Sequence, residues 1–515
     1  MKSTLSISRR AVIKKFAGGA ALAATAGAVR ALTQDEVGSP ASRLADQWRA
    51  LSRVGYGPTP ERVLALQGAP SAKAWALEQV DLAFAASRTP PRLAPDLAGI
   101  NVPLPQLFAG QQQERQARAQ LKAGDAPEQA DSPAFRRMDF SGPPDPVYFN
   151  RGMVAQAAAW RLGSSSQPAD ENPLLARMTE FWFNHLNIYA GKGPVRAFTG
   201  HYVINVARAH ALGKFEDMLL ASARHPAMLH YLDQVRSVAG DGRMGDGRGL
   251  NENYARELME LHTLGVDGGY SQSDVRELAR ILTGWTIDPT GSSGFRFAMR
   301  FHDTGSKTLM GRNYPDGLLG GGEREGEQAI RWLAHQPQTA RRISLRLAQF
   351  FVSDAPPPAL VAQLAQSFQN SQGDMRVVLQ ALLSSPEFWK AENRLFKTPM
   401  DFACSALTAV GASSAPSGAA PDRRHLALTA GFLAQAGQPV HGWQTPDGYK
   451  TDAATWLAPE ALTRRADYAL AVGRMASDME FLQPFLSANT RASIAQERPA
   501  LRAGLMLASP DFMYK

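Results

Sequence analysis

Cysteine is almost absent from the 515-residue chain, which contains Cys404 alone. A single cysteine cannot form an intrachain disulfide, and it cannot build a zinc or iron–sulfur site from several thiolates. The chain also lacks a Gly-x-Ser-x-Gly motif, and its glycine-rich segment at 240–249 lacks the Gly-Lys-Ser/Thr ending of a phosphate loop. These absences exclude a disulfide-stapled scaffold, a serine nucleophile elbow and a P-loop nucleotide site.

Charge of one sign and long apolar runs are also scarce in the body of the chain. The whole sequence has 55 Lys and Arg against 47 Asp and Glu, but five of the basic residues and no acidic residue fall within the first 28 positions. The remainder, with 50 basic against 47 acidic residues, is nearly neutral and predicts no nucleic-acid partner. Beyond the amino terminus no uncharged run approaches the ~20 residues of a membrane span, so we expect no transmembrane anchor.

The amino-terminal residues have the organisation of an export signal. Residues 8–14 read Ser-Arg-Arg-Ala-Val-Ile-Lys, and a weakly apolar stretch from Phe16 to Val29 follows. This segment resembles a twin-arginine signal peptide, with Val12 where Phe is more frequent. The resemblance predicts a signal peptide over 1–31, a spacer over 32–43, and export by the twin-arginine machinery to a periplasmic or secreted location. A basic amphipathic helix at the start of a cytoplasmic protein is the alternative.

Helical periodicity dominates the rest of the chain, and strand-like alternation is rare. Gly-rich and Pro-rich breaks separate the helical stretches, and residues 124–146 form an irregular excursion. Only residues 295–301 alternate well enough for one strand of a hairpin. The pattern predicts a mostly α fold, a single large multi-helix domain over 44–515 with at most a small β-hairpin. The expected helices are Glu61–Leu66, Ala72–Val80, Gln106–Ala123, Pro173–Tyr189, Glu325–Phe351, Pro358–Gln369, Met375–Leu383, Thr398–Val410 and several within Leu457–Leu507.

Three stretches rich in polar residues lie within apolar helical patterns: Met178–Tyr189, Asn251–Gly265 and Asp274–Trp285. Together with Phe301-His302-Asp303, Leu383–Trp389, Lys397-Thr-Pro399 and Gly442-Trp443, they resemble the bacterial domain-of-unknown-function family 1800 from about Leu51 to the carboxy terminus. The resemblance implies an exported, mainly helical protein of unestablished activity. It also implies a co-encoded exported protein as a partner.

Helical winding turns several polar groups toward the core. Placing residues 100° apart puts Glu257 inside an apolar arc of the helix around Leu258, and puts His185 inside the arc around Trp182. Asp274 shares an arc with apolar residues, although a capping role after Ser271 is equally open. Because an inward carboxylate needs a polar partner, we expect His185 and Glu257 to lie within one interaction shell.

These groups define the candidate site. The candidate catalytic residues are His185, Glu257, Glu260, His262, Asp274, His302 and Asp303, and the candidate substrate-binding residues are Asn253, Arg256, Trp285 and Trp443. The alternative is a core network in which His185 and Glu257 bond to each other or to Arg177 and Arg280. The sequence leaves a divalent metal open, but it contains neither a zincin His pair nor a di-iron Glu-x-x-His spacing, and no nucleotide or haem motif.

The function expected from these observations is acid/base or metal-assisted hydrolysis of an extracytoplasmic polymer or its fragments. Hydrolysis follows by elimination, since no redox or nucleotide motif is present. The alternative is a non-catalytic periplasmic binding or assembly partner of another exported protein. An enzyme needs its polar groups at an open pocket, whereas a scaffold buries them and exposes an apolar patch.

Overall fold

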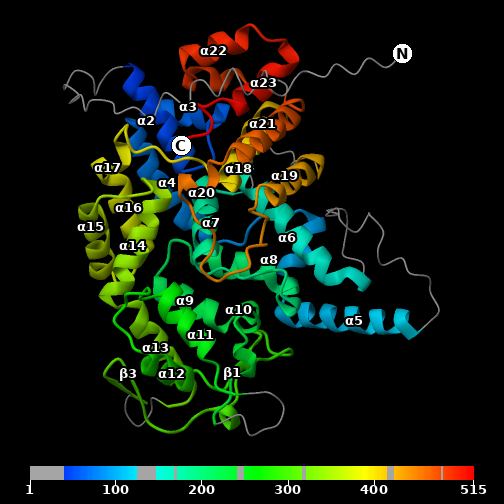
Figure 1. Cartoon of the computed structure of the whole chain (residues 1–515), viewed down its shortest axis with the longest axis vertical. Helices are drawn as coiled ribbons and strands as arrows, with labels where there is room; N and C mark the ends of the chain where they lie inside the picture. The colour runs from blue at the N-terminus through cyan, green and yellow to red at the C-terminus, as the bar shows by residue number, and fades with distance from the viewer. Residues whose placement is uncertain are drawn as a thin grey trace.

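The computed structural model describes residues 40–123, 146–166, 171–240, 249–315, 321–414, 423–476 and 479–515. The expected signal peptide, most of the spacer and most of the irregular excursion lie outside these residues. Helices make up most of the described chain, so the mostly α fold class is confirmed (Figure 1). The first helix, α2 (Pro40–Arg53), begins within the expected spacer.

Short caps and prolines define the limits of the helices in the first half. Pro173 begins α7 (Pro173–His185), and Asn172 caps it by accepting from the backbone N–H groups of Leu174 and Leu175. The other elements up to residue 281 are α3 (Pro60–Gly68), α4 (Ala72–Ser87), η1 (Pro95–Asn101), α5 (Leu104–Ala123), η3 (Pro146–Tyr148), α6 (Phe149–Ser166), η4 (Gly193–Phe198), α8 (Thr199–Tyr202), η5 (Val203–Arg208), α9 (Phe215–Arg224), α10 (Pro226–Tyr231), η6 (Gln234–Arg236), α11 (Glu252–Glu257), η7 (Leu258–His262) and α12 (Gln272–Ile281). The label η marks 3-10 helices, except that η5 and η7 are π-helical.

Two antiparallel hairpins follow α12, where one was expected. The first pairs β1 (Trp285–Ile287) with β2 (Phe295–Phe297), and the second pairs β3 (Lys307–Leu309) with β4 (Arg312–Tyr314). The helical pattern expected over Asp274–Trp285 ends at Ile281, and Trp285 begins β1 instead. Gly284 has a φ of 84°, which ends the helical path and turns the chain into β1.

Helices resume after the hairpins. The single helix expected over Glu325–Phe351 is two, because Pro337 begins a new helix. The elements are η8 (Met299–Phe301), α13 (Glu323–Ala334), α14 (Pro337–Phe351), α15 (Pro358–Asn370), α16 (Met375–Ser384), α17 (Pro386–Trp389), α18 (Pro399–Ser414), α19 (Arg423–Gln435), α20 (Ala453–Trp456), α21 (Pro459–Gly473), η9 (Glu480–Phe485), α22 (Ala488–Ala495) and α23 (Pro499–Ala508).

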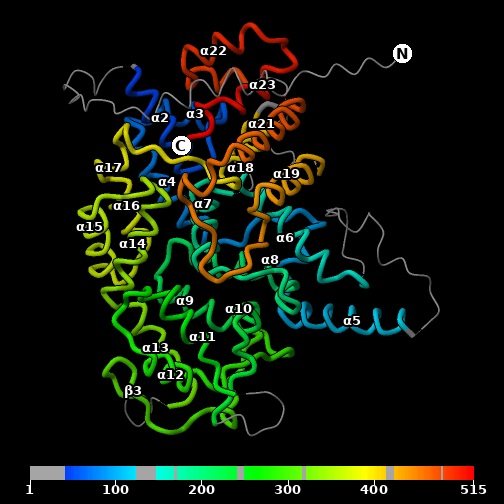
Figure 2. The backbone as a smooth tube through the Cα atoms, in the orientation of Figure 1, coloured from blue at the N-terminus to red at the C-terminus, as the bar shows by residue number. Residues whose placement is uncertain are grey.

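The elements are arranged along one long axis. The carboxy-terminal helices α21 to α23 lie at one end, and α11 to α13 with the hairpins lie at the other (Figure 1). Between them, the segment joining α19 to α20 descends beside α7 (Figure 2). Helix α7 therefore stands where the two ends meet.

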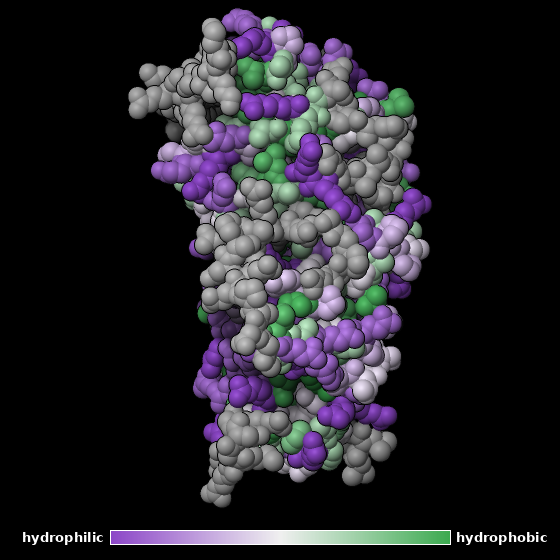
Figure 3. All heavy atoms as spheres, turned by 90° about the vertical axis from the view of Figure 1, so that its right-hand side faces the viewer, coloured by the Kyte–Doolittle hydropathy of each residue, from purple (hydrophilic) through white to green (hydrophobic). Residues whose placement is uncertain are grey.

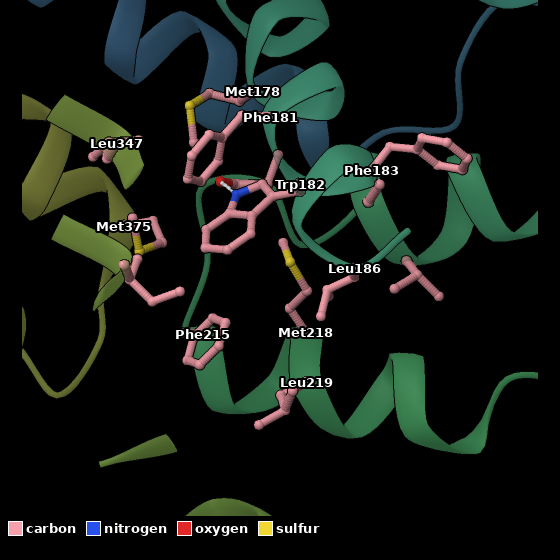
Figure 4. Close-up of a cluster of buried hydrophobic side chains, with 14 of the residues drawn as sticks. Met178, Phe181, Trp182, Phe183, Leu186, Phe215, Met218, Leu219, Leu347 and Met375 are labelled. Carbon is pink, nitrogen blue, oxygen red and sulfur yellow. Dashed lines mark hydrogen bonds between the residues drawn. The ribbon is translucent and has the colours of Figure 1, made fainter. Parts of the chain in front are cut away.

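Two apolar clusters form the core, and α7 contributes to both. In the larger one, the ring of Trp182 lies 5.5 Å from that of Phe215 and among Met218, Leu186 and Met375 (Figure 4). Its indole Nε1 donates to the carbonyl oxygen of Ala211 at 2.8 Å, so the only polar atom of this side chain is satisfied. The smaller cluster packs α18, α19, α21 and α23 against α6.

Candidate functional site

His185 is the last residue of α7 and is completely buried. Its Nε2 lies 3.0 Å from the main-chain oxygen of His262. Because a carbonyl oxygen only accepts, Nε2 carries the proton, and neutral His185 has its lone pair on Nδ1. Burial holds the pKa of His185 well below its usual range, and the nearby positive charges of Arg346 and Arg342 lower it further.

The helix that begins at Asn251 changes its period immediately after Glu257. Asn251 caps α11 by accepting from the N–H of Tyr254 at 3.1 Å, and residues Leu258–His262 then form a π turn. A π turn adds a residue to the helical period, so an arc drawn at 3.6 residues per turn does not continue through it. Short π segments occur frequently at functional sites.

His185 and Glu257, which winding predicted to share one interaction shell, have different partners. His262 is buried, and burial, followed by the charges of Arg342 and Arg346, lowers its pKa to about 3. Glu257 is only half-buried. The contacts of the described residues include none between His185 and Glu257, and the hydrogen-bonding partner of His185 is the backbone of His262. The partners expected in the core alternative are also taken, because Arg177 pairs with Asp401, and Arg280 with Asp303 and Glu277.

Glu257, the last residue of α11, interacts electrostatically with two other carboxylates. Burial raises the pKa of Glu257, the charges of Glu260 and Asp447 raise it further, and Arg256 lowers it. Burial raises the pKa of Tyr231, and the charges of Glu257 and Asp447 raise it further. The hydroxyl of Tyr231 donates to the oxygen of Gln444 at 2.7 Å. Glu257, Glu260 and Asp447 thus form an electrostatically coupled cluster, which we call the carboxylate cluster.

Asp447 comes from a loop nearly two hundred residues later, and two asparagines hold that loop. The side chain of Asn184 donates to the oxygen of Tyr449 at 3.0 Å and accepts from its N–H at 2.8 Å. Asn187 donates to the oxygens of Trp443 and Thr445 at 3.1 and 2.8 Å. A Cβ at Gly448 would overlap Asn184, so this position requires glycine. The sequence stretch around His185 contains both asparagines, yet their role depends on this tertiary contact.

An open cavity of about 320 Å³ lies between α7, α14 and residues 447–452; we call it the α14 cavity. Arg342 and Arg346, one helical turn apart on α14, line it together with Asp447. The Nε of Arg342 donates to the oxygen of Leu261 at 3.0 Å, which ties α14 to the π turn. Sequence reasoning missed both arginines, because an i,i+4 basic pair on an amphipathic helix is also typical of a solvated face.

Three other candidates hold the structure together. Asp274 completes a capping box with Ser271, and its second oxygen accepts from the N–H of Met310 at 2.6 Å. Asp303 pairs with Arg280 at 2.8 Å. His302 is buried, with Nε2 3.2 Å from Glu325, whose other oxygen lies 2.7 Å from the buried Lys307. These contacts fasten the hairpins to α12 and α13.

The four candidate substrate-binding residues do not share one surface. Asn253 is exposed, and Arg256 donates to Gln272 at 2.6 Å. Trp285 is completely buried beneath Arg224, whose guanidinium lies 5.5 Å from its ring, so it is a core residue. Trp443 is partly buried, 6.4 Å from Tyr449, in the loop that also carries Asp447.

A separate network of buried charges crosses the centre of the molecule. Glu180 of α7 pairs with Arg161 and accepts from the hydroxyl of Tyr449. Asp401 pairs with Arg177 and Lys515. All of these side chains are buried or nearly so, and each carboxylate is satisfied by cations or hydroxyls. This network connects α6, α7 and α18 and is a structural core.

Among the described residues, no group of three His, Cys, Asp or Glu side chains is placed to hold a metal ion. Within the same part of the chain, none of the helices combines the length and apolar character needed for a bilayer span.

The arrangement above defines a helical protein with a coupled carboxylate cluster beside an arginine-lined cavity. A family model described as "Protein of unknown function (DUF1800)" matches residues 49–514. The chain therefore belongs to the DUF1800 family, as the sequence motifs indicated. None of the curated proteins and none of the solved structures compared with the chain matches it.

Proposed function

We propose that the protein is an exported enzyme that hydrolyses an extracytoplasmic polymer or its fragments by acid/base chemistry, with Glu257 as the proton donor. The observation that carries this proposal is the carboxylate cluster. Glu257 is half-buried, and burial together with Glu260 and Asp447 raises its pKa. A carboxyl group whose pKa is raised keeps its proton closer to neutral pH, which is what a general acid requires.

Asp447 is the matching base in this proposal. It is exposed, and one of its oxygens accepts from the hydroxyl of Thr445 at 2.6 Å. In hydrolysis, Glu257 gives its proton to the leaving oxygen as the bond to that oxygen breaks. Asp447 takes a proton from the attacking water, whose oxygen forms the new bond, so one water is consumed. The next turnover begins when the proton returns to Glu257 through solvent.

Several earlier candidates take no part in this chemistry. The proton of His185 is engaged by a backbone oxygen, and His302 is enclosed by Glu325 and Lys307. The proposal uses carboxyl groups, which can supply and remove the protons that hydrolysis requires. The export part rests on the twin-arginine resemblance of residues 8–14.

The alternative is a non-catalytic partner of another exported protein. It draws support from the buried His185 and His302 and from the partly buried Asp303, which is engaged by Arg280. Two observations on the described residues do not favour the apolar docking patch that this alternative expects. The large exposed apolar side chains come from separate elements, among them Leu64, Leu121 and Met299. Hydrophilic side chains also lie between the hydrophobic ones on the face that Figure 3 displays.

The deciding experiment is a hydrolysis screen of extracytoplasmic polymers with the mature protein and two variants. We expect Glu257→Gln to lower turnover roughly 10²- to 10⁴-fold, because it keeps the shape and removes the proton. Glu252→Gln is the matched control on the same helix, since Glu252 only accepts from Gln272 at 2.7 Å. Equal turnover by the Glu257 variant, or no turnover of any polymer by the unmodified protein, would favour the binding alternative.

A further inference from the structure

Arg342 and Arg346 lie one turn apart on α14 and point their charges into one cavity, whereas most internal arginines of the described chain are held by carboxylates or by several backbone oxygens. Arg161 and Arg208 each pair with a glutamate, and Arg53 donates to several backbone oxygens. Neither Arg342 nor Arg346 forms a salt bridge with a described carboxylate. Arg342 has its bond to Leu261, and Arg346 only approaches the oxygen of Asp447 at 3.5 Å. Most of their N–H groups therefore face the α14 cavity without a protein acceptor.

Leaving these two cations unpaired is costly for the folded protein. Burial lowers the pKa of Arg346 to about 10, and the like charge of Arg342 contributes to the decrease. Burial also lowers the pKa of Arg342. Two neighbouring, partly desolvated guanidinium groups are poorly stabilised alone and well suited to share an anion, since each offers a planar fork of donors.

The position of Arg342 is fixed before any ligand arrives. Its Nε is held by Leu261, and a Cβ at Gly265 would lie 3.3 Å from its Nη1. Gly265, with a φ of 92°, leaves the room that the guanidinium occupies. A donor that is already ordered loses little entropy when it binds a ligand.

Acidic residues also line the cavity, and they offset the charge of this pair without forming an ion pair with it, since Asp447 raises the pKa of Arg346 and Glu260 that of Arg342. Asp354 accepts from the N–H of Ala453 at 2.8 Å, and Asp452 caps α20 by accepting from Thr455. Both are thus engaged at the start of a helix. The remaining wall carboxylate is Asp447, which belongs to the carboxylate cluster. A ligand in the cavity would meet two cations on α14 and Asp447, the member of the carboxylate cluster that lines the cavity and acts electrostatically on Glu257.

We propose that Arg342 and Arg346 bind an anionic group of the substrate, so that the polymer is a polyanion with a carboxylate, sulfate or phosphate on the unit next to the cleaved linkage. This inference rests on the proposed function and specifies its substrate class. Arg342 and Arg346 are the specificity-determining residues, and Glu257 and Asp447 perform the chemistry.

The test is calorimetric titration of the mature protein with glucuronate, sulfate and inorganic phosphate at constant ionic strength, with glucose as the neutral probe. We expect at least one anion to bind and glucose not to bind. Arg342→Gln and Arg346→Gln should each weaken anion binding roughly tenfold or more, because a hydrogen bond to a charged group is lost. Arg341→Gln, an exposed neighbour on α14, should bind as the unmodified protein does. The anion that binds shows whether the recognised group is a carboxylate, a sulfate or a phosphate.

The inference is overturned if no anion binds, or if both variants bind as tightly as Arg341→Gln. The Glu257→Gln variant tests the anion site and the proposed function independently. It should keep anion binding while losing turnover. Anion binding that depends on Arg342 and Arg346, together with full turnover by Glu257→Gln, would refute the proposed function and retain the anion site. Loss of turnover by Glu257→Gln, together with no anion binding by the unmodified protein, would support the proposed function and refute the anion site.

Discussion

The Nε2 of His185 donates to the main-chain oxygen of His262, 3.0 Å away, and not to a carboxylate. This bond joins the end of α7 to the π turn that follows Glu257. It holds a neutral imidazole against the backbone of that turn. His185 is therefore a residue that positions the π turn.

We expect His185→Leu to lower the free energy of unfolding by about 1–3 kcal/mol, because the buried oxygen of His262 loses its donor. His185→Gln places an amide N–H near the same oxygen and should recover part of the loss. Urea unfolding measures both variants. A His185→Gln protein with normal stability and no catalytic activity would contradict a positioning role and return His185 to the catalytic candidates.

The second prediction concerns the pKa of Glu257. Glu260→Gln and Asp447→Asn each remove a negative charge that raises this pKa, so both should lower it, with the larger decrease for Glu260→Gln. Arg256→Gln removes the charge that lowers it and should raise it. Carbon-13 NMR titration of labelled glutamate carboxyls measures the change in pKa. The resonance that is absent from the Glu257→Gln spectrum is assigned to Glu257. A pKa that is the same in all three variants would show that the cluster is not coupled.

The third prediction concerns the buried pair of Arg177 and Asp401. Burial opposes ionisation of Asp401, but the charges of Arg177 and Lys515 outweigh it and hold the pKa well below its ordinary value. Asp401→Asn leaves these cations unpaired and should cost about 3–5 kcal/mol of unfolding free energy. Asp81→Asn is the control, since Asp81 makes an exposed contact with Arg376 at 4.0 Å and should change stability by less than about 1 kcal/mol.

The sign of the pH dependence follows from the same pair. The folded-state pKa of Asp401 lies below its unfolded value, so its stabilising contribution is present above about pH 4 and is lost as the pH falls below that. As the pH is lowered from 7 to 3, the free energy of unfolding should therefore decrease more steeply for the unmodified protein than for Asp401→Asn. Parallel curves would contradict the assignment of the charge to Asp401.

The sequence predicted the features of the fold that depend only on residues close together in the chain. The helical periods, the hairpin strand at Phe295 and the capping role of Asp274 are decided within a few positions of the chain. The π turn after Glu257 could not be predicted, because an arc drawn at 3.6 residues per turn assumes an unbroken helix. The approach of Asp447 to Glu257 was also inaccessible, since it depends on Asn184 and Asn187 binding a loop more than 250 residues away.

The fourth prediction concerns export. Replacing Arg9 and Arg10 together by lysine should leave the precursor in the cytoplasm, because the twin-arginine pathway requires the guanidinium pair. Fractionation of cells followed by immunoblotting measures the distribution, and replacement of Lys14 and Lys15 by arginine is the control that keeps the charge. Normal delivery of the double-lysine variant to the periplasm would disprove this export route.

The last prediction uses stability to separate a ligand-binding cation from a structural one. Arg346→Met removes a partly buried charge that has no salt bridge, so it should raise the unfolding free energy by roughly 0.5–2 kcal/mol in the absence of anions. Arg161→Met removes a charge that pairs with Glu180 and should instead lower it by about 3–5 kcal/mol. Chemical denaturation of the two variants, with and without the anion that binds best, gives both values. Added anion should stabilise the unmodified protein and leave Arg346→Met nearly unchanged, because stabilisation by a ligand requires its site in the folded state. A loss of stability in Arg346→Met equal to that in Arg161→Met would mean that Arg346 serves the fold and not a ligand.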